Sequence, residues 1–189
     1  MKFHKNFSLL CIAFLAFTSL LGVVIYDFVG FRPYQANIKD MLRMAHPLHK
    51  VPSKAVLDLI SLSEGHNQIK NYVAQHLLAR FELDNRQMLW WHIEYSLWTF
   101  LMSTHYSDHD IFTLWLELAL YEEGCGLNNS ANYHYGHNLN QLNPEELATV
   151  VTIARSPSLY KADPKKLKER VNILLDRYRT NRGWNKSTS

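Results

Sequence analysis

The sequence predicts an all-α protein in which an N-terminal transmembrane helix precedes a helical domain. An uncharged run over residues 7–26 is long enough to span the apolar core of a bilayer as a helix. Further along the chain, apolar residues recur at the three- and four-residue spacing of amphipathic helices, and we find no convincing strand pattern or internal repeat. Hydrophobic residues make up 47% of the 189 residues, which is enough to build the core of one domain.

The N-terminal run predicts the topology of the chain. Lys2, His4 and Lys5 precede it, and basic residues on this side favour a cytoplasmic N-terminus with the rest of the chain outside. A cleaved signal peptide is the alternative, but the run is long for one and no small-x-small cleavage pattern follows it. We therefore assign residues 1–28 to a cytoplasmic N-terminus and a single-pass anchor. Residues 29–52 are then a membrane-proximal linker with one short amphipathic helix.

Residues 53–180 form the predicted helical domain, and residues 181–189 form a frayed tail. Ser53, Ser107 and Asn143 are suitable N-caps. Pro144 suits the first position of a helix, and Gly65 suits the end of one. We expect a loop at the polar stretch 128–140 and helices at residues 54–63, 68–83, 88–102, 108–120, 144–154 and 164–179.

Two glutamates are candidate functional residues. Glu94 is the one carboxylate in residues 88–102, a stretch so apolar on every side that we expect it to be buried all round. A buried carboxylate needs a partner, such as His92 or His105, or a cleft, and its pKa is then perturbed as at many functional sites. Glu64 ends an apolar helix, where the helix dipole opposes ionisation, as suits a general base. A solvated helix-end residue is the alternative for Glu64.

Composition and spacing exclude several functions. The net charge is only +3, and no basic stripe with interleaved aromatic residues indicates a nucleic-acid partner. The two cysteines, Cys11 and Cys125, and the ten histidines show neither a zinc-site spacing nor an HExxH pattern. We therefore predict no cofactor. A divalent metal is compatible with the chain, but no residue pattern supports one.

The C-terminal half carries five motifs in a fixed order. They are SDHDIFTLWL at 107–116, GCGL at 124–127, YGH at 135–137, LNPEELATVVTIARSPSLY at 142–160 and RVNILLDR at 170–177. In this order they are similar to the SKxEILELYLN, GAYGI, YFGK, LxxxEAALLAxLPxAPSxY and RRxxVLxRM segments of one family. The chain thus resembles the peptidoglycan glycosyltransferase domain of glycosyltransferase family 51, found in class A penicillin-binding proteins and monofunctional transglycosylases. Glu117 stands where the family usually has Asn.

The resemblance implies a fold and a pair of catalytic residues. The catalytic lobe of the family is related to the helical fold of lysozyme, so we expect a lysozyme-like helical domain. Glu64 falls at the first catalytic glutamate of the family, with Gly65 in place of the following Asp. Glu94 falls at the second, where Trp90 and Trp91 replace a basic pair. The chain from Glu64 to Gln75, the recognisable residue of the family's STITQQ motif, is far shorter than in the family, which implies that the membrane-embedded jaw is missing.

The resemblance also indicates substrate-binding residues. The family's STITQQ motif falls at residues 72–76, where Gln75 is the recognisable polar residue and His76 follows it. A diphosphate leaving group needs a cation beside it to stabilise the departing charge. Because Trp90 and Trp91 cannot supply one, Lys70 and Arg80 are the candidate replacements.

Three functions follow from these patterns. The first is a glycosyltransferase anchored in the bacterial inner membrane with its domain on the periplasmic side, where Glu64 is the base that polymerises lipid II, a lipid-linked disaccharide-peptide, into glycan strands. The second is a lysozyme-like or lytic enzyme that cleaves glycan, for which one glutamate of raised pKa in a cleft suffices. The third is an inactive relative that binds glycan or a cell-wall synthesis protein. Both enzymatic hypotheses require Glu64 and Glu94 to face one groove.

Overall fold

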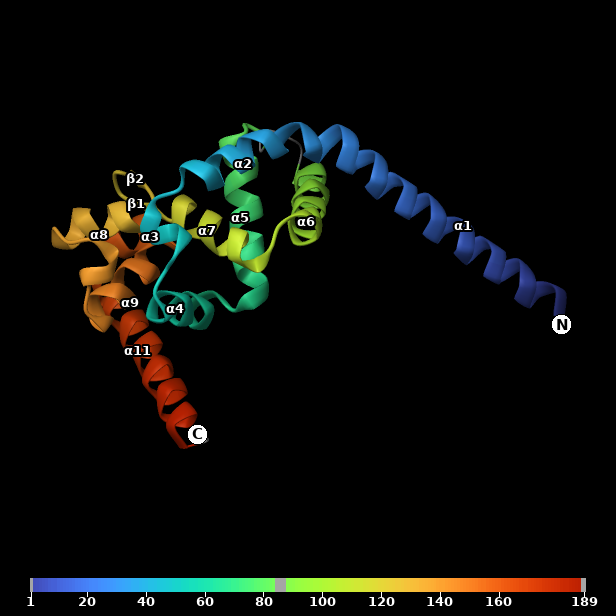
Figure 1. Ribbon diagram of the computed structural model, residues 1–189. Helices are drawn as coiled ribbons and strands as arrows, with labels where there is room; N and C mark the ends of the chain where they lie inside the picture. Colours follow the sequence, from blue (N-terminus) through green and yellow to red (C-terminus); the bar gives the residue numbers. More distant parts are fainter. Residues whose placement is uncertain (1, 84–87, 188–189) are drawn as a thin grey trace.

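The computed structural model describes residues 2–83 and 88–187 and confirms an all-α fold with a long apolar N-terminal helix. In Figure 1, α1 (Lys2–Tyr26) and the C-terminal α11 (Pro164–Ser187) project from a cluster of shorter helices. The other elements are η1 (Asp27–Phe31), η2 (Arg32–Tyr34), α2 (Gln35–Met44), α3 (Pro47–Lys50), α4 (Lys54–Glu64), α5 (His66–Arg80), α6 (Met88–His105), α7 (Asp108–Leu118), β1 (Leu120–Tyr121), β2 (Gly124–Cys125), α8 (Leu127–Tyr135), η3 (Leu139–Gln141), α9 (Pro144–Ile153) and α10 (Pro157–Ala162).

The apolar N-terminal helix continues directly into the domain. The helical stretch Phe14–Met44 is long and apolar enough to cross a membrane, as an anchor or a signal sequence would be. The predicted linker at residues 29–52 is not a free tether, because η1, η2 and α2 follow α1 without a break. Phe31 and Ile38 in this stretch are fully buried in the core. The expected short amphipathic helix is α2, and it packs on the domain through Ile38.

Local capping signals set several helix ends as the sequence predicted. The Ser53 hydroxyl accepts from a backbone N–H in the first turn of α4. Ser107 and Asp110 form a capping box at the start of α7, and Asn143 opens α9 in the same way. Gly65 separates α4 from α5 with a φ of +76°, a conformation that glycine adopts without steric cost.

The predicted loop at residues 128–140 is wrong, because α8 occupies most of it. The N–H of Asn128, in the first turn of α8, donates to Nε2 of His49 in α3 (3.0 Å). Ser130 and Ala131 are fully buried. These contacts come from distant parts of the chain, so the polar local composition concealed the helix. The short antiparallel hairpin of β1 and β2, which the sequence did not predict, joins α7 to α8.

The core lies where α5 and α9 meet the helices around them. α5 packs against α4, α6 and α7, and α9 packs against α4, α8 and α11. Fully or almost fully buried side chains from these helices include Leu59, Ile60, Ile69, Val73, Leu77, Trp98, Leu114, Trp115, Val150, Val151, Leu174 and Leu175.

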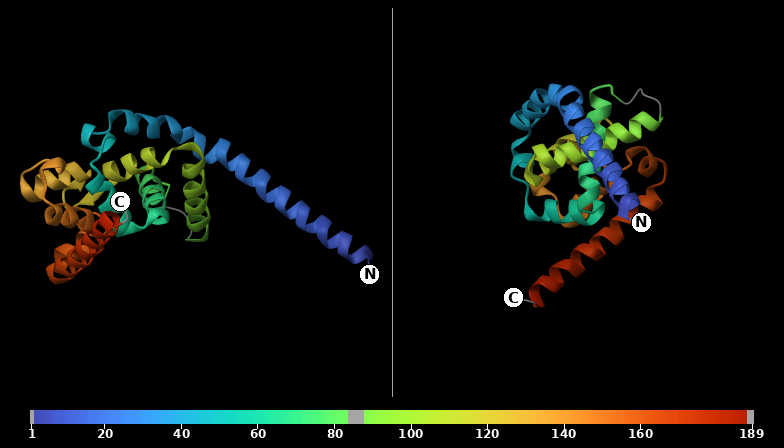
Figure 2. Two further views of the ribbon diagram at one scale, coloured as in Figure 1. Left: turned by 60° about the horizontal axis from the view of Figure 1, so that its bottom comes forward. Right: turned by 90° about the vertical axis from the view of Figure 1, so that its right-hand side faces the viewer.

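The expectation that residues 88–102 are buried on all sides is wrong. α6 buries only one face against the domain, through Trp98, Leu101 and Met102. Its other face is exposed and apolar, and Figures 1 and 2 show α6 on the side of the domain from which α1 leaves. The exposed large side chains of this face are Met88, Leu89, Trp90, Ile93 and Phe100, from 44% exposed for Ile93 to 79% for Met88.

Candidate functional site

The buried Glu94 is bonded to the end of the apolar N-terminal helix. The hydroxyl of Tyr26 donates to Oε1 of Glu94 (2.8 Å) and accepts from the indole N–H of Trp98 (3.1 Å). His105, one of the partners expected for Glu94, lies instead beside the buried Asp27 (2.9 Å). Glu94 therefore joins α6 to the last turn of α1.

Glu64 is buried at the C-terminal end of α4 and forms an ion pair with an arginine. Its side chain is only 5% exposed, and Nε of Arg155 lies 3.1 Å from its Oε1. The contact is not aligned as a hydrogen bond. Nη1 of Arg155 donates to the Ser63 carbonyl (3.0 Å). Burial raises the pKa of Glu64, and the positive charges of Arg155 and Arg170 oppose the rise. The sequence predicted this direction from the helix dipole, whereas burial is the main cause.

The structure does not bring Glu64 and Glu94 together as the shared-groove hypothesis requires. Glu64 directly precedes Gly65, the N-cap of α5. The cluster around Glu94 lies near the other end of α5, because Trp98 contacts Phe81, the C-cap of that helix (6.0 Å between ring centroids). The 15 residues of α5 rise roughly 22 Å. The catalytic roles of both glutamates stay predictions.

The segment expected to correspond to the STITQQ motif is structural in large part. The Tyr72 hydroxyl lies 3.1 Å from the Ala154 carbonyl oxygen and accepts from the N–H of Leu120 (3.2 Å). The His76 ring stacks on Tyr72 (3.8 Å between centroids), and its Nδ1 donates to the Tyr72 carbonyl (2.8 Å). Burial raises the pKa of the Tyr72 hydroxyl and lowers the pKa of His76. Tyr72 therefore holds α5 against the ends of α7 and α9, and His76 packs on Tyr72.

The other predicted binding residues do not form a group with the glutamates. Gln75 and Arg80 are exposed on α5. Lys70 lies 3.4 Å from Asp108 and lines a narrow crevice between α5 and α7. Their roles as substrate-binding residues therefore remain predictions without a shared cavity. Within residues 2–83 and 88–187, no three His, Cys, Asp or Glu side chains are placed to hold a metal ion.

A buried polar cluster that the sequence did not predict joins α3, α7 and α8. Oε1 of Glu117 accepts from Nδ1 of His49 (2.6 Å) and from the N–H of His46 (2.7 Å). Since Nε2 of His49 accepts from Asn128, the ring carries its proton on Nδ1. Burial opposes ionisation of Glu117, but these hydrogen bonds outweigh it and lower the pKa. Glu117, at the position where Asn is usual, therefore has a structural role.

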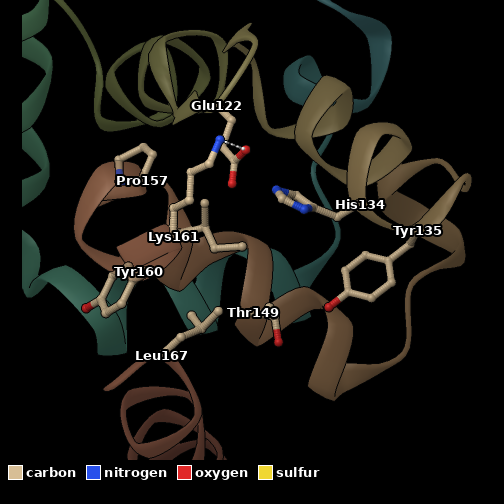
Figure 3. Close-up of a pocket in the computed structure, with 9 residues that line it drawn as sticks. Glu122, His134, Tyr135, Thr149, Pro157, Tyr160, Lys161 and Leu167 are labelled. Atoms are coloured by element: carbon tan, nitrogen blue, oxygen red, sulfur yellow. Dashed lines mark hydrogen bonds and ion pairs between the residues drawn. The ribbon is translucent and has the colours of Figure 1, made fainter. Parts of the chain in front are cut away.

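A polar cavity of about 270 Å³ opens between α8, α9 and α10. We call it the α8–α10 pocket. Figure 3 shows Lys161 and Glu122 paired at one side, with the His134 imidazole pointing toward the pair and the Tyr135 side chain pointing toward Thr149. Neither Glu64 nor Glu94 lines it. Its lining residues are Glu122, His134, Tyr135, Thr149, Ile153, Pro157, Tyr160, Lys161 and Leu167.

These features define a helical domain joined to an apolar helix of membrane-spanning length. The domain holds the Glu64 side chain, paired with Arg155, at the end of α4 and a separate pocket lined by α8 to α11. The family model named Transglycosylase matches residues 56–179, more than half of the chain. The chain therefore belongs to the transglycosylase family, the peptidoglycan glycosyltransferases of family 51. No curated protein matches the chain. The match lies inside the domain predicted at residues 53–180, and membership implies glycan or lipid II as the substrate class.

Proposed function

We propose that this chain is a membrane-held member of the transglycosylase family that binds glycan without polymerising lipid II. The observation that carries the proposal is the separation of Glu64 and Glu94 along α5. In glycoside hydrolases the two acting carboxylates lie about 5–10 Å apart, whereas Glu64 and Glu94 are engaged near opposite ends of a 15-residue helix and share no groove in which they could act together. Trp90 and Trp91 also offer no positive charge to a diphosphate leaving group.

The Glu64 contacts add to this proposal. A general base must reach the acceptor hydroxyl within hydrogen-bond distance. The Glu64 side chain is 5% exposed and is paired with Arg155. In this arrangement its carboxylate stabilises the domain through Arg155 and is not open to an acceptor hydroxyl. Binding requires only an accessible surface for glycan, and it makes no demand on Glu64.

Lipid II polymerisation with Glu64 as base is the second candidate function. The raised pKa of Glu64 favours it, because a base is most effective when its pKa lies near the working pH. Arg155 is one-third exposed, so its side chain has room to turn into solvent and release the carboxylate. This function departs from the shared groove that the sequence led us to require, because Glu64 would act alone and Glu94 would keep its structural bond to Tyr26.

Lipid II turnover and glycan binding separate the candidates. We would incubate the full chain in detergent micelles with labelled lipid II, beside an active polymerase of the family, and sediment it separately with peptidoglycan sacculi. We expect no glycan polymer, and we expect the wild type and Glu64→Gln to sediment equally with sacculi. Polymer made by the wild type but not by Glu64→Gln would establish the second candidate. Release of muropeptides from sacculi would establish the glycan-cleaving hypothesis.

The proposal includes a retained membrane anchor. Removal of α1 would take away the Tyr26 hydroxyl that donates to the buried Glu94, so this helix contributes to the folded domain. The exposed apolar face of α6 lies on the side from which α1 leaves (Figures 1 and 2). Trp90, 60% exposed, is a residue type enriched at membrane interfaces. We place this face of α6 against the bilayer that α1 spans, with the domain on the periplasmic side.

A further inference from the structure

The α8–α10 pocket has the size of a small-ligand site. Its volume of about 270 Å³ corresponds to roughly nine water molecules at about 30 Å³ each. That space accommodates one sugar ring. Four helices, α8 to α11, and the hairpin turn that carries Glu122 supply its walls, so the pocket does not depend on one segment of the chain.

The charges that line the pocket cancel. Nζ of Lys161 lies 2.8 Å from a carboxylate oxygen of Glu122, and these are the two charged side chains among the lining residues. A free anion would have to compete with Glu122 for the lysine, and a cation would have to compete with Lys161. A hydroxyl group can donate to Glu122 and accept from Lys161 together, so the pair favours a neutral, hydroxylated ligand.

One polar atom in the pocket wall has no partner. Nε2 of His134 is shielded from solvent and has no hydrogen-bond partner among the described residues. Buried polar atoms in folded proteins are nearly always hydrogen-bonded, so such an exception needs an explanation. Burial lowers the pKa of His134, which keeps the ring neutral. Because solvent does not reach Nε2 in this arrangement, a ligand hydroxyl would supply the missing partner only after the His134 ring turned about its Cβ–Cγ bond.

Apart from the Thr149 hydroxyl, the rest of the lining is apolar or aromatic. Ile153, Pro157 and Leu167 contribute aliphatic surface, and Tyr135 and Tyr160 contribute rings that end in hydroxyl groups. Sugars present apolar C–H faces as well as hydroxyl edges, and an N-acetyl group adds a methyl. This combination of surfaces fits an N-acetylhexosamine better than a small polyol.

We propose that the α8–α10 pocket is a subsite that binds one N-acetylhexosamine ring of a neutral glycan. Glu122 and Lys161 bind adjacent hydroxyls, and the aliphatic residues hold the acetamido methyl. His134 binds a third hydroxyl once its ring has turned toward the ligand. The subsite is separate from Glu64 and Glu94. It rests on the proposed glycan-binding function and names the surface that would perform it.

Calorimetric titration of the full chain in micelles with tetra-N-acetylchitotetraose tests the subsite. The variants Glu122→Gln, Lys161→Met and His134→Gln remove one polar contact each. The control is Lys166→Met, which breaks an exposed pair with Asp163 outside the pocket. We expect each pocket variant to weaken binding at least tenfold and the control to stay within twofold. Unchanged far-UV circular dichroism melting would show that the pocket variants are folded.

The outcomes distinguish the subsite from the proposed function. Tetrasaccharide binding that all three pocket variants retain would overturn the subsite and leave glycan binding in place. No binding by the wild type to either tetrasaccharide or sacculi would overturn both. Inorganic phosphate that displaces the sugar in a competition titration would identify an anion site and overturn the subsite.

Discussion

Replacement of Arg155 by methionine tests the account of the Glu64 environment. The variant removes the guanidinium that lies 3.1 Å from the Glu64 carboxylate, whose side chain is only 5% exposed beside Arg155. Removing one partner of a buried ion pair costs about 3–5 kcal/mol, because the remaining charge is uncompensated. Arg170 also stabilises the charge of Glu64, so we expect the lower end, about 3 kcal/mol.

The reverse substitution should cost far less. Glu64→Gln leaves an arginine that is one-third exposed and still donates to the Ser63 carbonyl. We expect a loss of about 1 kcal/mol or less, the range of solvent-exposed pairs. In a chain of this length, 1 kcal/mol shifts Tm by roughly 2–4 °C. Thermal melting in detergent, followed by circular dichroism, should therefore show roughly a 6–12 °C loss for Arg155→Met.

The pH dependence gives the prediction a second readout. A carboxyl whose pKa is raised on folding contributes stability that is fully present below its unfolded pKa and is lost as the pH rises through the folded pKa. Arg155→Met removes a charge that limits this rise. Its deficit should therefore be largest at neutral pH and should shrink as the pH falls toward 4.5, the ordinary value. Equal Tm losses for Arg155→Met and Glu64→Gln, or a deficit independent of pH, would refute the reasoning.

Three further predictions concern the anchor, the α3–α7–α8 cluster and α6. Tyr26→Phe removes the hydroxyl that joins Glu94 to Trp98 and should lower stability by about 1–3 kcal/mol. The same melting assay checks it, and an unchanged Tm would contradict the bond. Glu117→Gln should lower Tm at pH 7. The Tm difference from the wild type should vanish as the pH falls through the lowered Glu117 pKa, because a carboxylate whose pKa is lowered on folding stabilises the fold only while it is ionised. Brominated lipids should quench the tryptophan fluorescence of the chain in vesicles. Trp90→Phe should reduce that quenching, whereas the control Trp115→Phe, at a fully buried site, should not.

Signals confined to neighbouring residues predicted their part of the fold well. The caps at Ser53, Ser107 and Asn143 fix helix starts, because donor and acceptor lie within one turn. Gly65 ends α4 for an equally local reason. The family motifs of the C-terminal half are likewise continuous segments, and their order predicted the family that the comparison shows.

Features that depend on distant partners could not be predicted in this way. The start of α8 is bonded to His49, far back in the chain, so its polar composition suggested a loop. α6 is apolar on every side, which indicated burial, whereas one face is exposed. Arg155 belongs to a recognised motif, but nothing in its spacing reveals that it pairs with Glu64. The α8–α10 pocket combines the hairpin turn with four helices, and no single stretch of sequence contains its pattern.

In the membrane-held form that we propose, the bond between Tyr26 and Glu94 restricts how the domain moves. A flexible linker would let the domain move through a wide volume above the lipid and reach glycan at many heights. Here the helix runs from α1 through η1 into a packed α2, and the tyrosine fixes its rotation relative to α6. Lateral diffusion in the plane of the membrane, rather than movement of the domain above it, would then determine which glycan strands the protein binds.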